Sequence, residues 1–496
     1  MAVDSSLAPL PAKDFGPAQA RHLLNRAGFG GSPADVDEMV ELGLDGAVDV
    51  LIAGALMGNF QLPDPPVDAD VITPPDEQER MAFRNARRNG DEQVVERIRR
   101  ERLMRQRDDN EMYRDLQRWW LGWMINTPRP MQEKLVLLWH SHFATRHRNV
   151  RDTYLMYQQN CFFREHACGS FADLAHGIVR DPAMLVFLNN DRNIRREPNE
   201  NLARELMELF TLGEGNYSES DIKQGARALT GYHVEDNDFR FRKGVHDTGS
   251  KTILGRKGKF DGDDFVSILL RKKSCAQFVA FKLYRYFVAD ISDDPKVWTP
   301  AQKKIIEQMA GRLIKDGYEM APVLAQLLRS RHFYDAENVG TQVKSPAQLL
   351  VGTTRSLELP HRNYEVLTDA MRMMGQVLFD PPSVAGWDGG RGWMNTSTLF
   401  VRQNVCTYMI TGMDPRRGRW RKGQMGYDPQ PLIAGVEKTP RAIVDNLVDA
   451  MIGEYVSADR RTPLVAFMSA RDEPAGADSL TALLVLITAM PEYQLC

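Results

Sequence analysis

The chain has 496 residues, of which 43% are hydrophobic and 26% are charged. This composition is typical of a globular protein with a large core. The formal net charge of -3 argues against a surface that coats nucleic acid. No run of roughly eighteen apolar residues occurs, so no transmembrane segment is expected. The chain as given also begins without a visible signal peptide, which favours a soluble, cytoplasmic protein.

Hydrophobic spacing predicts two helices over residues 17–54, and Ser32 before Pro33 is a good start for the second. A proline-rich connector follows. Residues 77–126 then form a highly charged helical stretch that ends in an aromatic run. We interpret this stretch as a solvated arm that docks through its tryptophans and offers a surface to a protein partner. The alternative is that these tryptophans only pack on the core: Trp119, Trp120 and Trp123.

The element around WHSHF is apolar almost all round and is expected to be buried. Further helices are expected up to residue 237, then a small β-hairpin over 238–260, and helices again beyond it. A Gly/Trp-rich loop at 381–404 interrupts this second helical part. The predicted fold is therefore mainly α, a large multi-helix body with a small inserted β-hairpin. The expected divisions are an N-terminal segment and connector, the arm, a core with the site, and C-terminal helices: 1–76, 77–126, 127–430 and 431–496.

The segment NENLARELMELFTL, residues 199–212, carries the strongest polar pattern. Pro198 and Asn199 predict that a helix starts here. At 100° per residue its apolar side chains share one arc and its polar side chains share the other. An ordinary solvated helix face explains this pattern, and so does a functional stripe. The stripe contains Asn201, Arg204, Glu205 and Glu208.

WHSHF places His140 and His142 in the buried element. In a regular helix the two rings lie about 200° apart and cannot bind one metal together. If the segment is extended, or the helix breaks at Ser141, both rings point the same way. Buried imidazoles need partners, and the acids of the 199–212 stripe are suitable. Such a meeting would form a structural pair, an acid-base couple, or a site for a divalent transition metal. The candidate metal ligands are His140, His142, Glu205 and Glu208.

Three other segments add candidates. Asn190 in the loop LNNDRN is a candidate for substrate binding, as is Asn201 of the stripe, although turn formation is the simpler role for the loop. HDTGSK offers His246, Asp247 and Lys251 as acid, base or anion ligand, although an exposed turn explains them equally. The Gly/Trp-rich loop resembles a rim that grips a carbohydrate or peptide, although core anchoring of the loop is the alternative. Its candidates for substrate binding are Trp387, Trp393 and Arg402.

Several segments together resemble one bacterial family, that of domain of unknown function 1800 (DUF1800). In chain order they include HLLNRAGFG, LLWHSHFAT, NENLARELMELFTLGEGNYSESDI, HDTGSK and PPSVAGWDGG. The resemblance runs from about residue 17 to the end. It implies a mainly helical bacterial protein, often exported and often encoded beside a sulfatase-like protein. It implies no particular reaction. This chain differs in lacking a visible export signal, in its charged arm, and in Tyr232-His233 where the family typically has a single Trp.

Two hypotheses of function follow. In the first, the protein is an enzyme in which WHSHF, the 199–212 stripe and HDTGSK converge on a buried site for a polar peptide- or carbohydrate-like substrate. The two histidines then act as ligands or base, Glu205 and Glu208 as ligands or acid, and Arg204 and Lys251 hold an anion. In the second, the protein is a non-catalytic scaffold or accessory subunit, and the stripe is an internal salt-bridge network.

Overall fold

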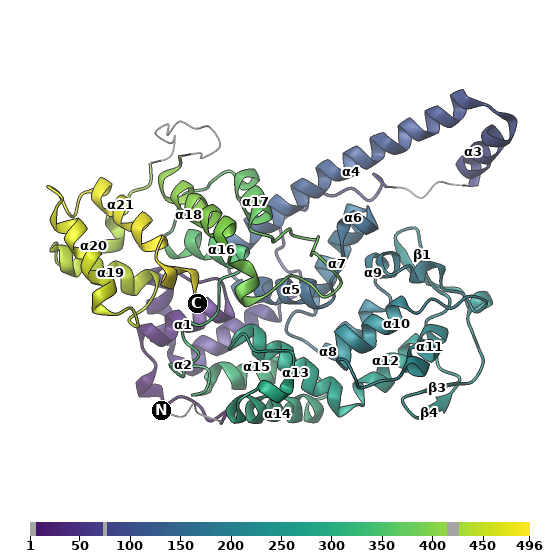
Figure 1. The fold of residues 1–496 in the computed structure, drawn as a ribbon, viewed down its shortest axis with the longest axis horizontal. Helices are drawn as coiled ribbons and strands as arrows, with labels where there is room; N and C mark the ends of the chain where they lie inside the picture. Colours follow the sequence, from purple (N-terminus) through teal and green to yellow (C-terminus); the bar gives the residue numbers. More distant parts are fainter. Residues whose placement is uncertain (1–5, 73–76, 414–425) are drawn as a thin grey trace.

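The computed structural model describes residues 6–72, 77–413 and 426–496, and it confirms a mainly helical fold with a small β insertion (Figure 1). The buried apolar side chains form one cluster that extends from Leu7 to Tyr493. No helix in the described ranges is both long and apolar enough to cross a membrane. The first part of the body contains α1 (Pro17–Ala27), α2 (Pro33–Ala55), α5 (Pro130–His142), α6 (His147–Val150), α7 (Thr153–Glu165), α8 (Phe171–Ile178) and α9 (Pro182–Phe187).

The predicted helix pair at 17–54 is confirmed as α1 and α2. Ser32 caps α2 as expected: its hydroxyl accepts a hydrogen bond from the Asp35 amide at 3.3 Å, and the Asp35 carboxylate accepts one from the Ser32 amide at 2.8 Å. The middle of the chain continues with α10 (Asn201–Glu205), α11 (Glu219–Ala228), α12 (Gly262–Leu270), α13 (Lys273–Phe287), α14 (Pro300–Lys315) and α15 (Met320–Arg329). The last part contains α16 (Pro346–Ser356), α17 (Tyr364–Met373), α18 (Thr396–Thr411), α19 (Pro440–Met451), α20 (Ala458–Ser469) and α21 (Ala477–Thr488).

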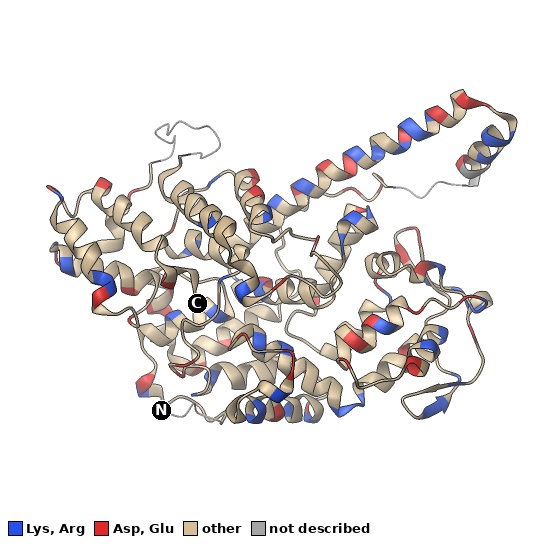
Figure 2. Ribbon diagram, in the orientation of Figure 1, with Lys and Arg blue, Asp and Glu red and all other residues tan. Residues whose placement is uncertain are grey.

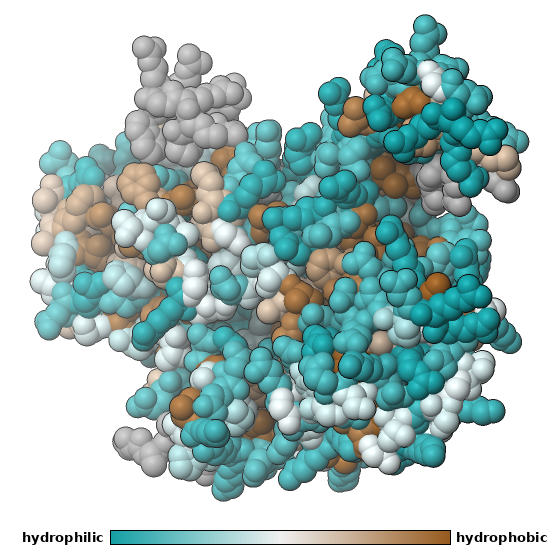
Figure 3. Space-filling model, turned by 45° about the vertical axis from the view of Figure 1, so that its right-hand side comes forward, coloured by the Kyte–Doolittle hydropathy of each residue, from teal (hydrophilic) through white to brown (hydrophobic). Residues whose placement is uncertain are grey.

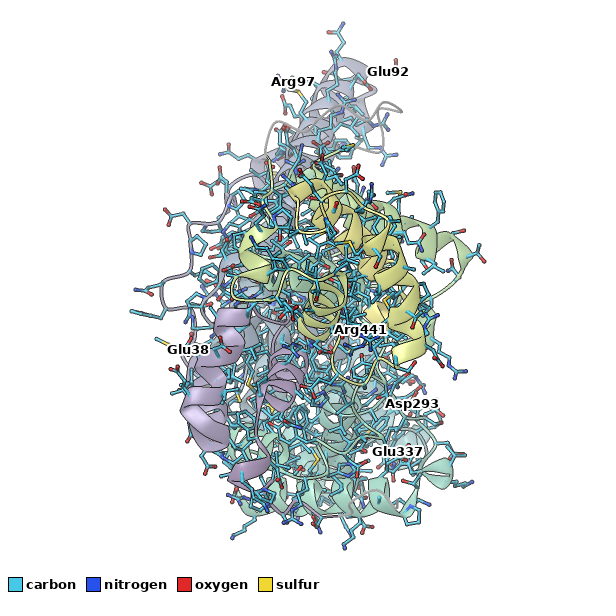
Figure 4. All side chains as sticks on the ribbon, turned by 90° about the vertical axis from the view of Figure 1, so that its left-hand side faces the viewer. Glu38, Glu92, Arg97, Asp293, Glu337 and Arg441 are labelled. Atoms are coloured by element: carbon cyan, nitrogen blue, oxygen red, sulfur yellow. The ribbon has the colours of Figure 1, made fainter. Side chains whose placement is uncertain are left out.

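The charged arm consists of α3 (Glu77–Asn89) and the long helix α4 (Glu92–Asn126), and it projects from the body (Figure 1). Charges of both signs alternate along it (Figure 2), and Glu92 and Arg97 lie near its far end (Figure 4). In the space-filling view its surface is mainly hydrophilic (Figure 3). At its base Trp120 is fully buried, so the arm is anchored in the core by its aromatic end.

The β insertion is larger than the single hairpin predicted for 238–260. Strand β1 (Tyr232–Glu235) pairs with β2 (Asp238–Phe241), and β3 (Lys251–Ile253) pairs with β4 (Arg256–Gly258). The first hairpin turns at Asp236 and Asn237, which both have positive φ, as a tight two-residue hairpin requires. That turn lies before the expected start of the insertion, which is why the prediction missed β1.

The 199–212 segment is not one regular α-helix. Glu200 stands at the N-cap position, and the Asn199 side chain accepts a hydrogen bond from the Asn201 amide at 2.9 Å, as expected. After α10 the chain widens into a π-helix, η3 (Leu206–Thr211). The assumption of 100° per residue therefore fails from Leu206 onwards. Short π-helical segments cost regular hydrogen-bond geometry and occur frequently at functional sites.

Candidate functional site

A cavity of about 1160 Å³ lies between α5, η3, α13 and the Trp loop, which we define as residues 381–395. Three of the predicted motifs contribute to its wall: His142 from WHSHF, Glu208 from the 199–212 segment, and Trp387 with Trp393 from the Trp loop. The structure therefore brings WHSHF, the 199–212 segment and the Trp loop together at one cavity.

His142 ends α5 and is held by η3. Its Nε2 lies 3.0 Å from the carbonyl oxygen of Phe210; because a carbonyl only accepts, Nε2 carries the proton. Burial, assisted by the positive charge of Lys282, lowers the pKa of His142 to about 3, against the opposing effect of the Phe210 carbonyl. The ring is therefore neutral at pH 7. Within the described residues its Nδ1 is buried and has no hydrogen-bond partner.

His140 faces away from the cavity, because α5 is helical through both histidines. Its Nε2 accepts a hydrogen bond from the side-chain amide of Asn160 at 3.0 Å, and its ring packs among Trp120, Phe163 and Phe379. Burial, together with the positive charge of Arg164, lowers the pKa of His140 to about 3. WHSHF is thus helical, the case in which the two rings point in different directions. His140 is a core residue rather than a second ligand or base beside His142.

A buried ion pair behind His140 was missed in the sequence. The Glu133 carboxylate accepts hydrogen bonds from Arg164 at 2.6 and 3.0 Å and from the indoles of Trp120 at 2.7 Å and Trp123 at 2.9 Å. Arg164 also donates to Asn160, the partner of His140. This network ties the base of the arm to α5 and α7. An acid within an otherwise apolar helix was the signal that could have revealed it.

The four residues of the polar stripe do not share one environment. Glu208 reaches the cavity and accepts a hydrogen bond from the Tyr217 hydroxyl at 2.7 Å. Glu205 is half-buried, and its pKa is raised by burial and by the nearby Glu208. Arg204 instead lies at the surface, where it pairs with Glu219 at 2.8 Å and with Glu200 at 3.3 Å. Asn201 is exposed. The stripe is therefore not the internal salt-bridge network of the scaffold hypothesis.

HDTGSK does not converge with the other motifs. Asp247 pairs with Arg227 at 2.7 Å, which lowers the Asp247 pKa, and the ring of His246 donates from Nδ1 to the Thr230 carbonyl at 2.8 Å. The ammonium of Lys251 is buried against the carbonyls of Asp247 and Gly249, and burial lowers its pKa. These contacts close a turn, and none of the three predicted residues lines the cavity.

Two predicted substrate contacts are core residues instead. Asn190 is 1% exposed and donates to the carbonyls of Leu229 and Tyr232. Arg402 is fully buried, and it donates to the Lys344 carbonyl at 2.8 Å; burial lowers its pKa to about 10. A single sequence shows their polarity but not the carbonyls that satisfy it.

The Trp loop is positioned by close backbone contact with α5. The Trp387 amide donates to the Ser141 hydroxyl at 3.3 Å, and Gly386 has a φ of +93°. A Cβ at Gly386 would lie 2.2 Å from the Ser141 carbonyl oxygen, so only glycine fits there. Trp387 and Trp393 are largely buried in the cavity wall, and the Trp387 indole nitrogen has no partner among the described residues.

The predicted metal site is not formed. His140 and His142 face different surroundings, and Glu205 does not line the cavity that Glu208 and His142 share. In the described ranges no three His, Cys, Asp or Glu side chains gather in a way that could hold a metal ion. For the two histidines to bind together, WHSHF had to be extended or the helix had to break at Ser141, whereas the helix continues to His142.

The fold and the cavity define a class: a mainly helical protein with a cavity that is lined by residues from all three thirds of the chain and has the π-helical segment in its wall. A family model described as "Protein of unknown function (DUF1800)" matches residues 22–495, so the chain belongs to that family. No curated protein and no solved structure matches the chain.

Proposed function

We propose that the protein is an enzyme that acts on a polar, peptide- or carbohydrate-like substrate bound in the 1160 Å³ cavity. His142 and Glu208 form its acid-base pair, and Trp387 and Trp393 pack against the substrate. The observation that carries the proposal is the hydrogen bond from His142 to Phe210, because it joins the imidazole to the π-helical segment that brings Glu208 into the same cavity.

The chemistry divides between two groups. Neutral His142 has a buried Nδ1 without a partner, which accepts a hydrogen bond from a substrate hydroxyl or a water once the neighbouring side chains move aside. Glu208 is the proton-transfer group, held in place by the Tyr217 hydroxyl. Flat indole faces beside planar polar donors suit sugar rings and peptide groups. A cavity of this size holds a ligand of several residues or rings.

The test is turnover of a panel of chromogenic glycosides and peptide anilides. Glu208→Gln is expected to lower kcat by about 100-fold or more on any substrate that is turned over. Glu219→Gln is the matched control: it removes a carboxylate from the same region, but this side chain is 69% exposed and lies outside the cavity. Equal turnover by wild type and Glu208→Gln would remove Glu208 from the mechanism.

The scaffold alternative makes a different prediction for Glu205. If its charge fixed the fold, Glu205→Gln would damage folding. The raised pKa of Glu205 shows that its charge is disfavoured by burial and by Glu208. We therefore expect Glu205→Gln to melt cooperatively, at or slightly above the temperature of the wild type.

One observation favours an additional binding role for the arm. Leu103 and Met104 are 61% and 62% exposed on α4, far from the anchored base. We propose that this part of the arm contacts a protein partner, since apolar side chains exposed on a projecting helix are typical of such surfaces. A photo-crosslinking residue at 103 should capture that partner, whereas one at Arg97 on the charged, exposed part of α4 should capture it less. Equal labelling from both positions would contradict the assignment.

A further inference from the structure

The cavity extends along one face of α13. Residues at helical spacing from Ser274 to Arg285 line it, and they include Gln277, Phe278 and Lys282. At a rise of 1.5 Å per residue, this face is roughly 16 Å long. The cavity therefore has room for a chain of several units rather than for a single small ring.

Four aromatic rings form a row in the cavity wall. The ring centroids of His142 and Phe278 lie 6.1 Å apart, and those of Phe278 and Phe281 lie 6.4 Å apart. Trp298 continues the row, with its centroid 5.1 Å from that of Phe281. All four side chains line the cavity. Because two rings separate His142 from Trp298, a ligand that touches both ends of the row contains more than one unit.

Trp298 is held as a rigid platform at the end of this row. It stacks on Phe281 at an interplanar angle of 23°, and its Nε1 donates a hydrogen bond to the Ser292 carbonyl at 2.7 Å. Phe281 is 4% exposed, whereas Trp298 is only half-buried, so part of the indole surface is open. Since the indole is already fixed, a ligand that stacks on it loses little affinity to side-chain ordering.

The charged side chains beside the aromatic row are paired with each other. The Nζ of Lys282 lies 5.0 Å from the ring centroid of Phe278 and 3.9 Å from the Asp293 carboxylate. Asp293 lies toward the surface (Figure 4) and also pairs with Arg285 at 3.0 Å. The rest of the wall carries both signs as well: Lys134, Lys303, Glu208, Glu214, Glu307 and Asp388.

A wall of mixed charge favours an uncharged ligand over a polyanion or a polycation. Hydroxyl groups suit such a wall, because each one both donates and accepts a hydrogen bond. An extended peptide is the other ligand with enough length, and such peptides commonly bind by adding a strand to the edge of a sheet. None of the strands β1 to β4, which are those of the described ranges, lines this cavity. The wall therefore favours a carbohydrate.

We propose that Trp298 is a stacking subsite for one sugar ring of an uncharged oligosaccharide, whose chain lies along α13 and reaches His142 and Glu208. This inference rests on the proposed function, because it names the class of substrate that enters the same cavity. It also adds a binding residue that lies apart from the acid-base pair and was not among the candidates predicted from the sequence.

The test is isothermal titration calorimetry in the Glu208→Gln background, so that turnover does not consume the ligand. The ligands are hexasaccharides of glucose, xylose, mannose and N-acetylglucosamine, the corresponding disaccharides, and uncharged peptides of matched length. Trp298→Ala removes the platform. Trp119→Ala is the matched control: this indole is also half-buried and donates to a carbonyl, that of Pro63 at 3.3 Å, but it lies outside the cavity.

We expect at least one hexasaccharide to bind. Trp298→Ala should weaken its binding about tenfold, and Trp119→Ala should leave it unchanged. Equal affinities in the two variants would overturn the subsite, and so would a disaccharide that binds as tightly as the hexasaccharide. Binding of peptides alone, or of no ligand, would overturn the carbohydrate assignment. If Trp298→Ala does not fold, Trp298→Leu takes its place, with the same expected loss.

This test is separate from turnover. Oligosaccharide binding that depends on Trp298, in a protein whose turnover is unchanged by Glu208→Gln, would overturn the acid-base proposal alone. Turnover that needs Glu208, without any binding that depends on Trp298, would overturn the stacking subsite alone.

Discussion

The Glu133–Arg164 ion pair allows one prediction to be worked out in full. Both side chains are 0% exposed, and Arg164 supplies two of the four hydrogen bonds on the Glu133 carboxylate. Arg164→Met preserves the stem of the side chain but leaves the carboxylate buried with only the two indole donors. Removing one partner of a buried pair costs about 3–5 kcal/mol.

The expected change in melting temperature follows from the length of the chain. An entropy of unfolding of about 2.1 cal/mol/K per residue over 496 residues is about 1 kcal/mol/K. A loss of about 3–5 kcal/mol therefore lowers the melting temperature by about 3–5 °C. Calorimetry at pH 7 measures this shift, and urea unfolding measures the change in free energy.

Two comparisons make the result specific. Arg148→Met breaks a surface pair with Asp380, in which Arg148 is 57% exposed, and should cost at most about 1 kcal/mol. The double variant Glu133→Leu/Arg164→Met leaves no uncompensated charge and should recover much of the loss. An Arg164→Met variant as stable as Arg148→Met at pH 7 would refute this reasoning.

Three further predictions concern the cavity wall and pH. Gly386→Ala should cost about 1–3 kcal/mol and weaken ligand binding, because its Cβ would meet the backbone of α5, whereas Gly389→Ala has room and should melt like the wild type. The folded-state pKa of His140 and of His142 is about 3, below the value of 6.5 in the unfolded chain, so the protein loses stability as the pH falls below 6.5. The NMR chemical shifts of their ring protons should stay constant from pH 8 to pH 5. A titration midpoint in that range would contradict the burial of the two rings. Burial raises the pKa of Asp181 to about 7, so the stability that its protonated carboxyl contributes is lost as the pH rises through 7. Asp181→Asn should remove this fall in the free energy of unfolding between pH 4 and 7. A variant whose urea unfolding depends on pH as the wild type's does would contradict the prediction.

The charged and aromatic pattern of the arm is an example of local structure that the sequence predicted correctly. Residues 77–126 alternate charges over many turns and end in tryptophans, and the structure has two helices there with a buried base. The caps of α2 and α11 at Ser32 and Ser218 follow from the same local rules. The helix content, the charged arm and a β insertion could thus be predicted from neighbouring residues alone.

The sequence predicted only part of the site, because the rest depends on local helix geometry and on contacts between distant residues. Whether Glu208 reaches the cavity depends on the π-helix after Glu205, and no periodicity count anticipates that widening. Polar residues such as Arg402 look functional in a sequence, but their partners are backbone carbonyls that lie far along the chain. The burial of Lys134 and its hydrogen bond to Gln348 of α16 follow only from the tertiary structure.

The sequence by itself determined which segments are helical and which motifs belong to the family, because hydrophobic period, caps and motif spacing act over a few residues. The tertiary structure alone decided that His142 and Glu208 share a chamber while His140 and HDTGSK do not. That outcome depends on the direction in which each side chain leaves its helix, and on contacts between residues more than 60 positions apart, such as His142 and Phe210.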